Sequence, residues 1–220
     1  MRRVSTIIAL GCGCALAVAP PTALAQAPGQ PTELDARVRA FLDGHRHAWR
    51  DMNVPAVDGQ RLYDLVLERG FTRALEVGTS TGHSAIWIAW ALSKTGGRLI
   101  TIEIDERRHH EALANFEAAG LSRYIDARLA DAHELVPALE GPFDFVFQDA
   151  DKDWYARYFE SLYPKLAAAA CYVAHNVSGS RQRGQGEFIA ALNAKPDLTT
   201  AFVAGPGSGG MSVSCRGGGP

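Results

Sequence analysis

The sequence predicts an α/β fold with a mostly parallel sheet of seven strands, helices on both faces and an antiparallel strand at the C-terminal end. Short apolar runs alternate with segments of helical periodicity through the middle of the chain, which is typical of parallel strands joined by crossover helices. The last two apolar runs are separated only by the glycine-rich stretch "GPGSGG", which favours a hairpin. With 220 residues, 47% of them hydrophobic, the chain is long enough for one well-buried domain.

The N-terminal stretch "MRRVSTIIALGCGCALAVAPPTALAQ" has the pattern of a cleavable secretory signal. Two arginines precede an apolar segment, and an A-x-A pattern ends at Ala25, so residues 1–25 are predicted as a signal peptide of an exported protein, periplasmic or secreted. The apolar part is too short and interrupted for a membrane span of about 20 residues. An alternative interpretation takes Cys12 as a lipid-attachment site. Residues 26–32 are predicted as a flexible linker.

The elements follow in order along residues 33–215, which form a single predicted domain. Two helices come first, at residues 38–49 and 59–70. The alternating part then has strands at residues 73–77, 98–104, 125–130, 143–148 and 171–176 and helices at residues 84–94, 107–120, 132–139 and 155–169. A helix at residues 186–194 precedes the hairpin strands, residues 198–204 and 211–215, and residues 216–220 are predicted as a disordered tail.

Composition narrows the range of partners. The formal net charge of −2 shows no basic excess, so nothing indicates nucleic-acid binding. A small-molecule partner is expected, and a homodimer is left open. Two of the four cysteines, Cys171 and Cys215, lie outside the predicted signal. Both lie in strand-like apolar runs, which favours small buried hydrophobic residues over a disulfide.

A glycine-rich loop, "LEVGTSTGHS", joins the first predicted strand to a helix. The spacing of Gly78 and Gly82 differs from the G-x-G-x-x-G dinucleotide fingerprint. Glu103 ends the next strand, where an acid can accept hydrogen bonds from a ribose diol. The loop and this acid together favour a nucleoside ligand at the carboxyl ends of the strands of a Rossmann-like, doubly wound sheet.

With these residues placed, the chain from about Met52 to Cys215 resembles the metal-dependent class I O-methyltransferases, the family of catechol and caffeoyl-CoA O-methyltransferases. The resemblance is carried by "MNV", "LEVGTSTGHSAIWIA", "TIEI", "DAHELV", "DADKDWY" and the "HN" of "VAHNV". It implies a site for S-adenosyl-L-methionine. The implied contacts are the Val54 backbone and Glu76 at the amino-acid end, Gly78 and Ser84 in the same pocket, Glu103 at the ribose, and Asp131, Ala132 and His133 beside the adenine. Ser84 as an ordinary helix-start residue and His133 as a solvated histidine remain open.

The resemblance also assigns roles within "DADKDWY". Asp149 is similar to a metal ligand of the family and is counted with the cofactor site as well, and Lys152 resembles its general base. A hard divalent cation prefers oxygen ligands and can lower the pKa of a bound hydroxyl. A lysine beside it is a credible proton acceptor. Asp151 and Asp153 are interpreted as solvating the loop.

The sequence departs from the family at "AHNV", where the family pattern has an Asp-Asn pair. Asn176 is kept as a predicted ligand, whereas His175 replaces the aspartate. An imidazole ligand would shift the preference from Mg²⁺ toward a transition metal such as manganese, zinc, iron or nickel. The alternative is a weakened or empty metal site. Gln148, where an apolar residue is usual, is a second departure.

The predicted function is S-adenosylmethionine-dependent methylation of a hydroxyl on a small, aromatic vicinal diol, assisted by a divalent metal. An exported, non-catalytic binding protein on a decayed scaffold is an alternative, motivated by His175 and by the export signal, because S-adenosylmethionine is made in the cytoplasm. A nicotinamide-dependent oxidoreductase is a weaker alternative, since the G-x-G-x-x-G pattern is absent.

Overall fold

The structure, a computed structural model, describes residues 31–177 and 185–217. The predicted signal peptide, Cys12 and most of the predicted linker lie outside the described residues. Thr32, which belongs to that linker, is described and caps the first helix: its hydroxyl accepts the Asp35 N–H, and the Asp35 carboxylate accepts the Thr32 N–H. This capping box explains why the first helix begins at Glu33, before the predicted residue 38.

A sheet of seven strands confirms the predicted fold class. Its spatial order is β3-β2-β1-β4-β5-β7-β6, and β1 to β5 pair in parallel. β7 is antiparallel to both β5 and β6, which confirms the C-terminal hairpin. The strands are β1 (Arg73–Val77), β2 (Arg98–Glu103), β3 (Ile125–Leu129), β4 (Phe143–Gln148), β5 (Leu166–His175), β6 (Leu198–Val203) and β7 (Met211–Arg216).

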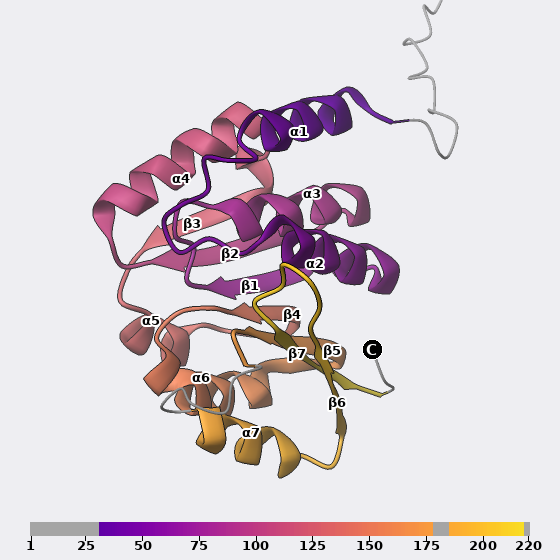
Figure 1. Cartoon of the computed structure of the whole chain (residues 1–220). Helices are drawn as coiled ribbons and strands as arrows, with labels where there is room; N and C mark the ends of the chain where they lie inside the picture. Colours follow the sequence, from indigo (N-terminus) through magenta and orange to yellow (C-terminus); the bar gives the residue numbers. More distant parts are fainter. Residues whose placement is uncertain (1–30, 178–184, 218–220) are drawn as a thin grey trace, which may run out of the picture. The chain divides into compact units, whose positions relative to one another are not determined.

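The described helices cover both faces of this sheet (Figure 1). One face packs against α1 (Glu33–Gly44), α2 (Ala56–Arg69), α3 (His83–Thr95) and α4 (Glu106–Ala119). The other packs against α5 (Ala132–Ala138), α6 (Tyr155–Leu162) and α7 (Gln185–Asn193). Neighbouring strand residues alternate between the two apolar cores, as Ala74 and Leu75 do, because side chains of a strand point to opposite faces. No helix in these described ranges is both long and apolar enough to cross a membrane.

The prediction of one helix over residues 155–169 is wrong. The helix α6 ends at Leu162, a short 3₁₀ turn (Tyr163–Lys165) follows, and the alanine-rich stretch begins β5. Pro164 cannot continue a helical hydrogen-bond ladder. Leu166 then pairs with Phe143, so strand pairing overrides the high helix propensity of alanine.

The interpretation of the two cysteines as separate buried hydrophobic residues is also wrong. Cys171 on β5 and Cys215 on β7 are opposite each other in the ladder and form a disulfide. Neighbouring strands bring their Cβ atoms close, which the sequence separation of 44 residues did not reveal. The strand then continues into the predicted tail, because Arg216 donates to Asp197 and to the carbonyl of Leu166. Residues 218–220 lie outside the described part of the chain.

Candidate active site

The candidate site lies where the strand order of the sheet reverses. From the central strand β1 the chain runs outward through β2 to β3 and returns to the other side of β1 with β4. Such a reversal opens a crevice outside the carboxyl ends of the strands, where ligands bind in open α/β sheets. The loops after β1 and β4 meet there: the Asp149 N–H donates to the carbonyl of Val77 at 2.9 Å, and Gly78 lies against the Asp149 backbone.

Glu76 is a fully buried acid near the end of β1. Its Oε2 accepts a hydrogen bond from the Thr101 hydroxyl, whereas its Oε1 is buried without a hydrogen-bond partner among the described residues. Burial raises the pKa of Glu76 to about 8, although the hydroxyls of Ser84 and Thr101 oppose this shift. An ammonium group of a ligand would supply the missing donor to Oε1, so the pocket of Glu76 and Ser84 fits the amino-acid end of the predicted cofactor.

Glu103 ends β2 with its carboxylate held by backbone N–H groups. Its Oε2 accepts from Ser80 at 2.7 Å, and its Oε1 accepts from Ile104 and Asp105 at 3.0 and 2.9 Å. Ser80 has a φ of +49°, so this acid holds the glycine-rich loop in an uncommon backbone conformation. Each carboxylate oxygen has two lone pairs, which leaves capacity for a ligand hydroxyl.

Val54 lies just before α2, at the same edge, with its carbonyl already engaged. His83 Nδ1 lies 2.8 Å from the Val54 oxygen, and Trp87 donates to His83 Nε2 at 3.0 Å. Burial lowers the pKa of His83 to about 4, so the ring is neutral and Nδ1 carries the hydrogen. The structure therefore ties the Val54 segment to the first turn of α3.

The residues predicted beside the adenine lie at the start of α5. Asp131 caps this helix by accepting the His133 N–H at 2.9 Å, and Ala132 is its first residue. The His133 ring stacks on Trp154, with ring centroids 3.8 Å apart. The Ala130 N–H donates to the carbonyl of Glu103 at 2.9 Å, which joins this segment to the end of β2.

Asp149 and Lys152 are paired beyond β4. Lys152 Nζ lies 2.5 Å from Asp149 Oδ1 and donates to the Tyr155 hydroxyl at 2.8 Å. Tyr155 is buried, and its hydroxyl lies 3.1 Å from the carbonyl oxygen of His175. Lys152 is thus fixed by an acid and a phenol at the mouth of the crevice.

His175 lies between two carboxylates. Its Nδ1 is 3.1 Å from Asp149 Oδ2, and its Nε2 is 3.0 Å from Asp58 Oδ2. Burial by itself would lower the pKa of His175, but the hydrogen bonds to Asp149 and Asp58 raise it above the ordinary value. Burial would raise the pKa of Asp58, and hydrogen bonds from Ser208, Gly209 and His175 lower it. Both contacts therefore favour the protonated form of the His175 ring.

The residues predicted to hold a metal do not fit a metal ion in this arrangement. Both ring nitrogens of His175 face carboxylates, and both Asp149 oxygens face a cationic side chain. Asn176, with a φ of +58°, follows β5 and completes the predicted ligand set. Within residues 31–177 and 185–217, no group of three or more His, Cys, Asp or Glu side chains is placed to hold a metal ion.

The sequence did not single out Asp58 or Tyr155 as site residues. Asp58 reaches His175 from the first turn of α2, 117 residues away in the chain. Tyr155 belongs to "DADKDWY", which gave a local signal, whereas a single aspartate near the start of an amphipathic helix is indistinguishable from an ordinary first-turn acid. Only the folded arrangement shows that Asp58 is fully buried and faces a histidine.

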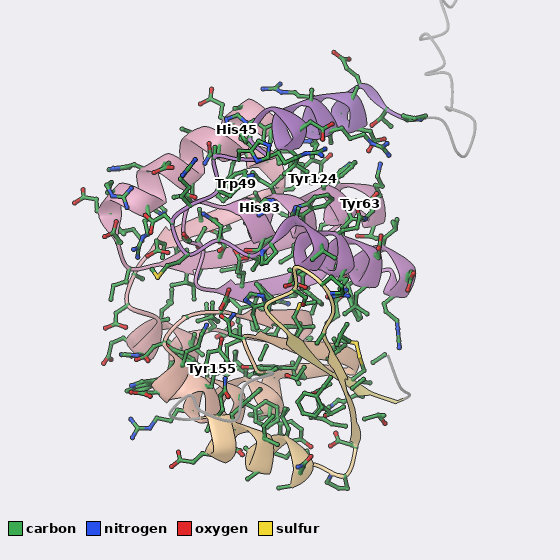
Figure 2. All side chains as sticks on the ribbon, in the orientation of Figure 1. His45, Trp49, Tyr63, His83, Tyr124 and Tyr155 are labelled. Carbon is green, nitrogen blue, oxygen red and sulfur yellow. A yellow bond between two sulfur atoms is a disulfide. The ribbon has the colours of Figure 1, made fainter. Side chains whose placement is uncertain are left out.

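A separate hollow of about 830 Å³ lies among α1, α2 and α3. Figure 2 shows three of its lining residues, Trp49, Tyr63 and His83, on the side of α1 to α3. Tyr155, which does not line the hollow, lies on the side of α6. Val54 also lines this hollow. The aromatic hollow therefore borders the Val54 segment, which is predicted to contact the methyl donor. Glu76, Glu103, Asp149 and Lys152 do not line the hollow.

Comparisons with known proteins point to one family. Residues 34–177 match the family model described as O-methyltransferase. The chain is 41% identical over 107 residues to a catechol O-methyltransferase of Niastella koreensis, covering 47% of this chain and 48% of that protein. It is 35% identical over 123 residues to caffeoyl-CoA O-methyltransferase 1 of Zea mays, covering 53% and 47%. The chain thus spans about half the length of the curated relatives that it matches.

Two solved structures share the fold over most of their length. An O-methyltransferase from Bacillus cereus in complex with SAH has a TM-score of 0.71 at 28% identity and covers 83% of this chain and 91% of that one. The O-methyltransferase TomG from Streptomyces achromogenes, in complex with SAM, has a TM-score of 0.69 at 27% identity and covers 86% and 92%. Both carry the nucleoside type that the glycine-rich loop and Glu103 predicted for this chain.

Proposed function

This chain belongs to the O-methyltransferase family, and from that premise we propose that it transfers a methyl group from S-adenosylmethionine to a hydroxyl of a small, aromatic vicinal diol. The observation that carries the proposal is the convergence of Glu76, Glu103 and the Asp149–Lys152 pair at one edge of the sheet. Within the described part of the chain, Oε1 of Glu76 has no hydrogen-bond partner and can accept from an ammonium group, and Glu103 has spare capacity for a diol.

The donor end of the site has a defined set of roles. Glu76 binds the amino group, Glu103 binds the ribose hydroxyls, and Asp131 to His133 border the base. S-adenosylmethionine supplies an electrophilic methyl group on a sulfonium centre. The Gly78 backbone permits the loops after β1 and β4 to meet without a side chain between them. This contact holds the two loops together at the edge of the site.

The acceptor end depends on Lys152. In its neutral form, Lys152 takes the proton of the substrate hydroxyl as that oxygen forms a bond to the methyl carbon and the carbon–sulfur bond breaks. The products are a methyl ether, S-adenosylhomocysteine and a protonated lysine. Asp149 then pairs with the ammonium group, and the Tyr155 hydroxyl keeps Nζ in place. No step is assigned to a metal ion, because the donor atoms of Asp149 and His175 are engaged with each other and with neighbouring side chains.

The test is a binding and turnover measurement on the mature chain. Calorimetry with S-adenosylhomocysteine should show saturable binding, and NADH should show none. Incubation with S-adenosylmethionine and catechol should give a methylated product by mass spectrometry. Binding of NADH in place of S-adenosylhomocysteine would refute the proposal in favour of an oxidoreductase. Binding without methyl transfer to any of a panel of diols would support a non-catalytic binding protein.

We also propose that the protein is exported. The Cys171–Cys215 disulfide supports this, because disulfides persist in oxidising compartments and are rare in the cytosol. Cell fractionation of the full chain, beside a variant that begins at residue 26, should place only the former outside the cytoplasm. Retention of both in the cytoplasm would contradict export.

A further inference from the structure

We propose that the hydrogen-bonded bridge Asp58–His175–Asp149 occupies the donor atoms that a divalent cation would need, so that methyl transfer at this edge needs no metal, and that Asp58 is the positioning residue that holds the bridge. This inference rests on the proposed function, since it concerns whether methyl transfer at the same site needs a metal ion. It differs from the metal assistance that the sequence resemblance implied.

The geometry of His175 carries the first step. A metal ion binds an imidazole through a nitrogen lone pair, so one nitrogen must be free of hydrogen. Here each nitrogen lies within hydrogen-bond distance of a carboxylate oxygen, at 3.1 Å for Asp149 and 3.0 Å for Asp58. An ionised carboxylate only accepts hydrogen bonds, so satisfying both acids requires a hydrogen on each nitrogen. A ring in that state has no lone pair for a metal.

Asp58 is fixed so firmly that the ring cannot easily be released. It is fully buried, and it accepts hydrogen bonds from the Ser208 hydroxyl at 2.7 Å, the Gly209 N–H at 2.8 Å and Arg61 at 3.1 Å. These donors come from α2 and from the loop before β7. An acid held by three donors besides His175 does not move aside at small cost.

Gly209 packs closely against the ring. A Cβ at this position would lie 2.6 Å from both Cε1 and Nε2 of His175 and 2.9 Å from Nδ2 of Asn176. Real Cβ atoms essentially never approach so closely. The glycine loop is therefore packed directly on the ring, on the side of Nε2, and on the third predicted ligand.

The contacts of Asp149 explain what the bridge does for the reaction. Asp149 faces Lys152 on one oxygen and His175 on the other. The ring joins Asp149 to Asp58, whose carboxylate lies against the other ring nitrogen. Because the ring is fixed by hydrogen bonds on both sides, it holds Asp149 in place beside Lys152, so that this pair needs little reorganisation during the reaction.

The experiment compares wild type with His175→Asp, using His110→Asp, an exposed position on α4, as the control. Each protein is stripped with a chelator and titrated with MnCl₂ and with S-adenosylhomocysteine by calorimetry, and turnover is measured with and without chelator. Wild type and the control should show no saturable Mn²⁺ binding, and their turnover should change less than twofold with chelator. His175→Asp leaves three carboxylates together, so its Mn²⁺ affinity should rise at least about 100-fold and its turnover should become chelator-sensitive.

A second comparison tests Asp58 as a positioning residue. Asp58→Asn should lower kcat at least about tenfold while leaving the affinity for S-adenosylhomocysteine unchanged. Its ¹⁵N NMR spectrum should lose the signal of a doubly protonated His175 ring. If Asp58→Asn does not fold, Ser208→Ala is the second variant, because it removes one hydrogen bond to Asp58 without altering the ring. It should lower kcat by a smaller factor.

Stoichiometric Mn²⁺ binding by wild type that disappears in His175→Ala would overturn the inference, as would loss of turnover with chelator and its recovery with Mn²⁺. Failure of wild type to bind S-adenosylhomocysteine would instead overturn the proposed function. The two failures are therefore distinguishable in one set of titrations.

Discussion

Gly78 lies directly against the backbone of Asp149: a Cβ at position 78 would lie 2.9 Å from both the carbonyl carbon and the carbonyl oxygen of Asp149. Gly78 also has a φ of +98°, which side chains rarely tolerate. The contact joins the glycine-rich loop of the donor site to Asp149, which pairs with Lys152. A substitution in the loop should therefore also shift Asp149.

Replacing Gly78 by alanine should therefore destabilise the protein and weaken cofactor binding. Gly96→Ala is the matched control, because Gly96 also has a positive φ but no atom of the described residues lies within 4 Å of a Cβ there. The control should lose about 1–2 kcal/mol of unfolding free energy from backbone strain alone. Gly78→Ala should lose more and should also bind S-adenosylhomocysteine more weakly by calorimetry. Equal losses in the two variants would show that the contact with Asp149 is unimportant.

Glu103→Gln should weaken S-adenosylhomocysteine binding, since an amide is a poorer acceptor for ribose hydroxyls than a carboxylate. Loss of a charge-assisted hydrogen bond costs about 1.5–3 kcal/mol. Glu106→Gln, at the exposed start of α4, should leave the affinity unchanged. Titration calorimetry measures both variants, and an unaltered dissociation constant in Glu103→Gln would remove Glu103 from the ribose site.

Glu76 makes the stability of the ligand-free protein depend on pH. Its pKa rises from the ordinary 4.5 to about 8 on folding, so the folded state keeps a proton that the unfolded state has lost between these values. The contribution of this group is complete below pH 4.5 and is lost as pH rises through about 8. The slope is about 1.4 kcal/mol per pH unit within that window.

Glu76→Gln should remove this slope. Urea unfolding of both proteins at intervals from pH 5 to pH 8 should show the variant gaining stability relative to wild type as pH rises. Parallel curves would mean that Glu76 is ionised in the folded protein throughout the range.

Lys152→Met should lower turnover by a factor on the order of 10² or more, the usual contribution of a general base, with little change in affinity for S-adenosylhomocysteine. Lys165→Met is a suitable control, because Lys165 donates to carbonyls of α5 and lies away from the crevice. Wild-type turnover in Lys152→Met would require another proton acceptor.

Removing the disulfide should reduce stability under oxidising conditions. The bridge closes a loop over a separation of 44 residues, for which the chain-entropy relation gives about 4 kcal/mol. Cys171→Ala/Cys215→Ala should unfold at lower urea concentration than oxidised wild type, and wild type with a strong reductant should approach the variant. If reductant leaves the wild-type midpoint unchanged, the bridge contributes nothing measurable.

The sequence predicted the parts of the fold in which local pattern and tertiary structure agree. β1 and β4 were predicted with their observed bounds, because each is a short apolar run between clear loop signals. The alanine-rich start of β5 was mispredicted, because alanine favours a helix locally and only pairing with β4 makes the stretch a strand.

The candidate site also has residues that the sequence predicted and residues that it could not predict. Glu76, Gly78, Glu103 and Lys152 belong to local motifs, and the structure brings them to one edge. The contact of His175 with Asp58 could not be predicted, because Asp58 comes from a helix 117 residues earlier and carries no motif of its own. Buried ion pairs between distant elements are set by packing, and local periodicity does not record packing across the sheet.

The ladder between β5 and β7 has Cys171 opposite Cys215 at one end and His175 opposite Met211 at the other. Side chains of a strand alternate between faces, so a slip of β7 by one residue would turn Met211 to the opposite face and carry Gly209 away from Asp58. A glycine-rich turn has little intrinsic preference for one register. The disulfide at the far end of the ladder therefore fixes the register of β7 against β5. In doing so it fixes the position of Gly209 against the His175 ring.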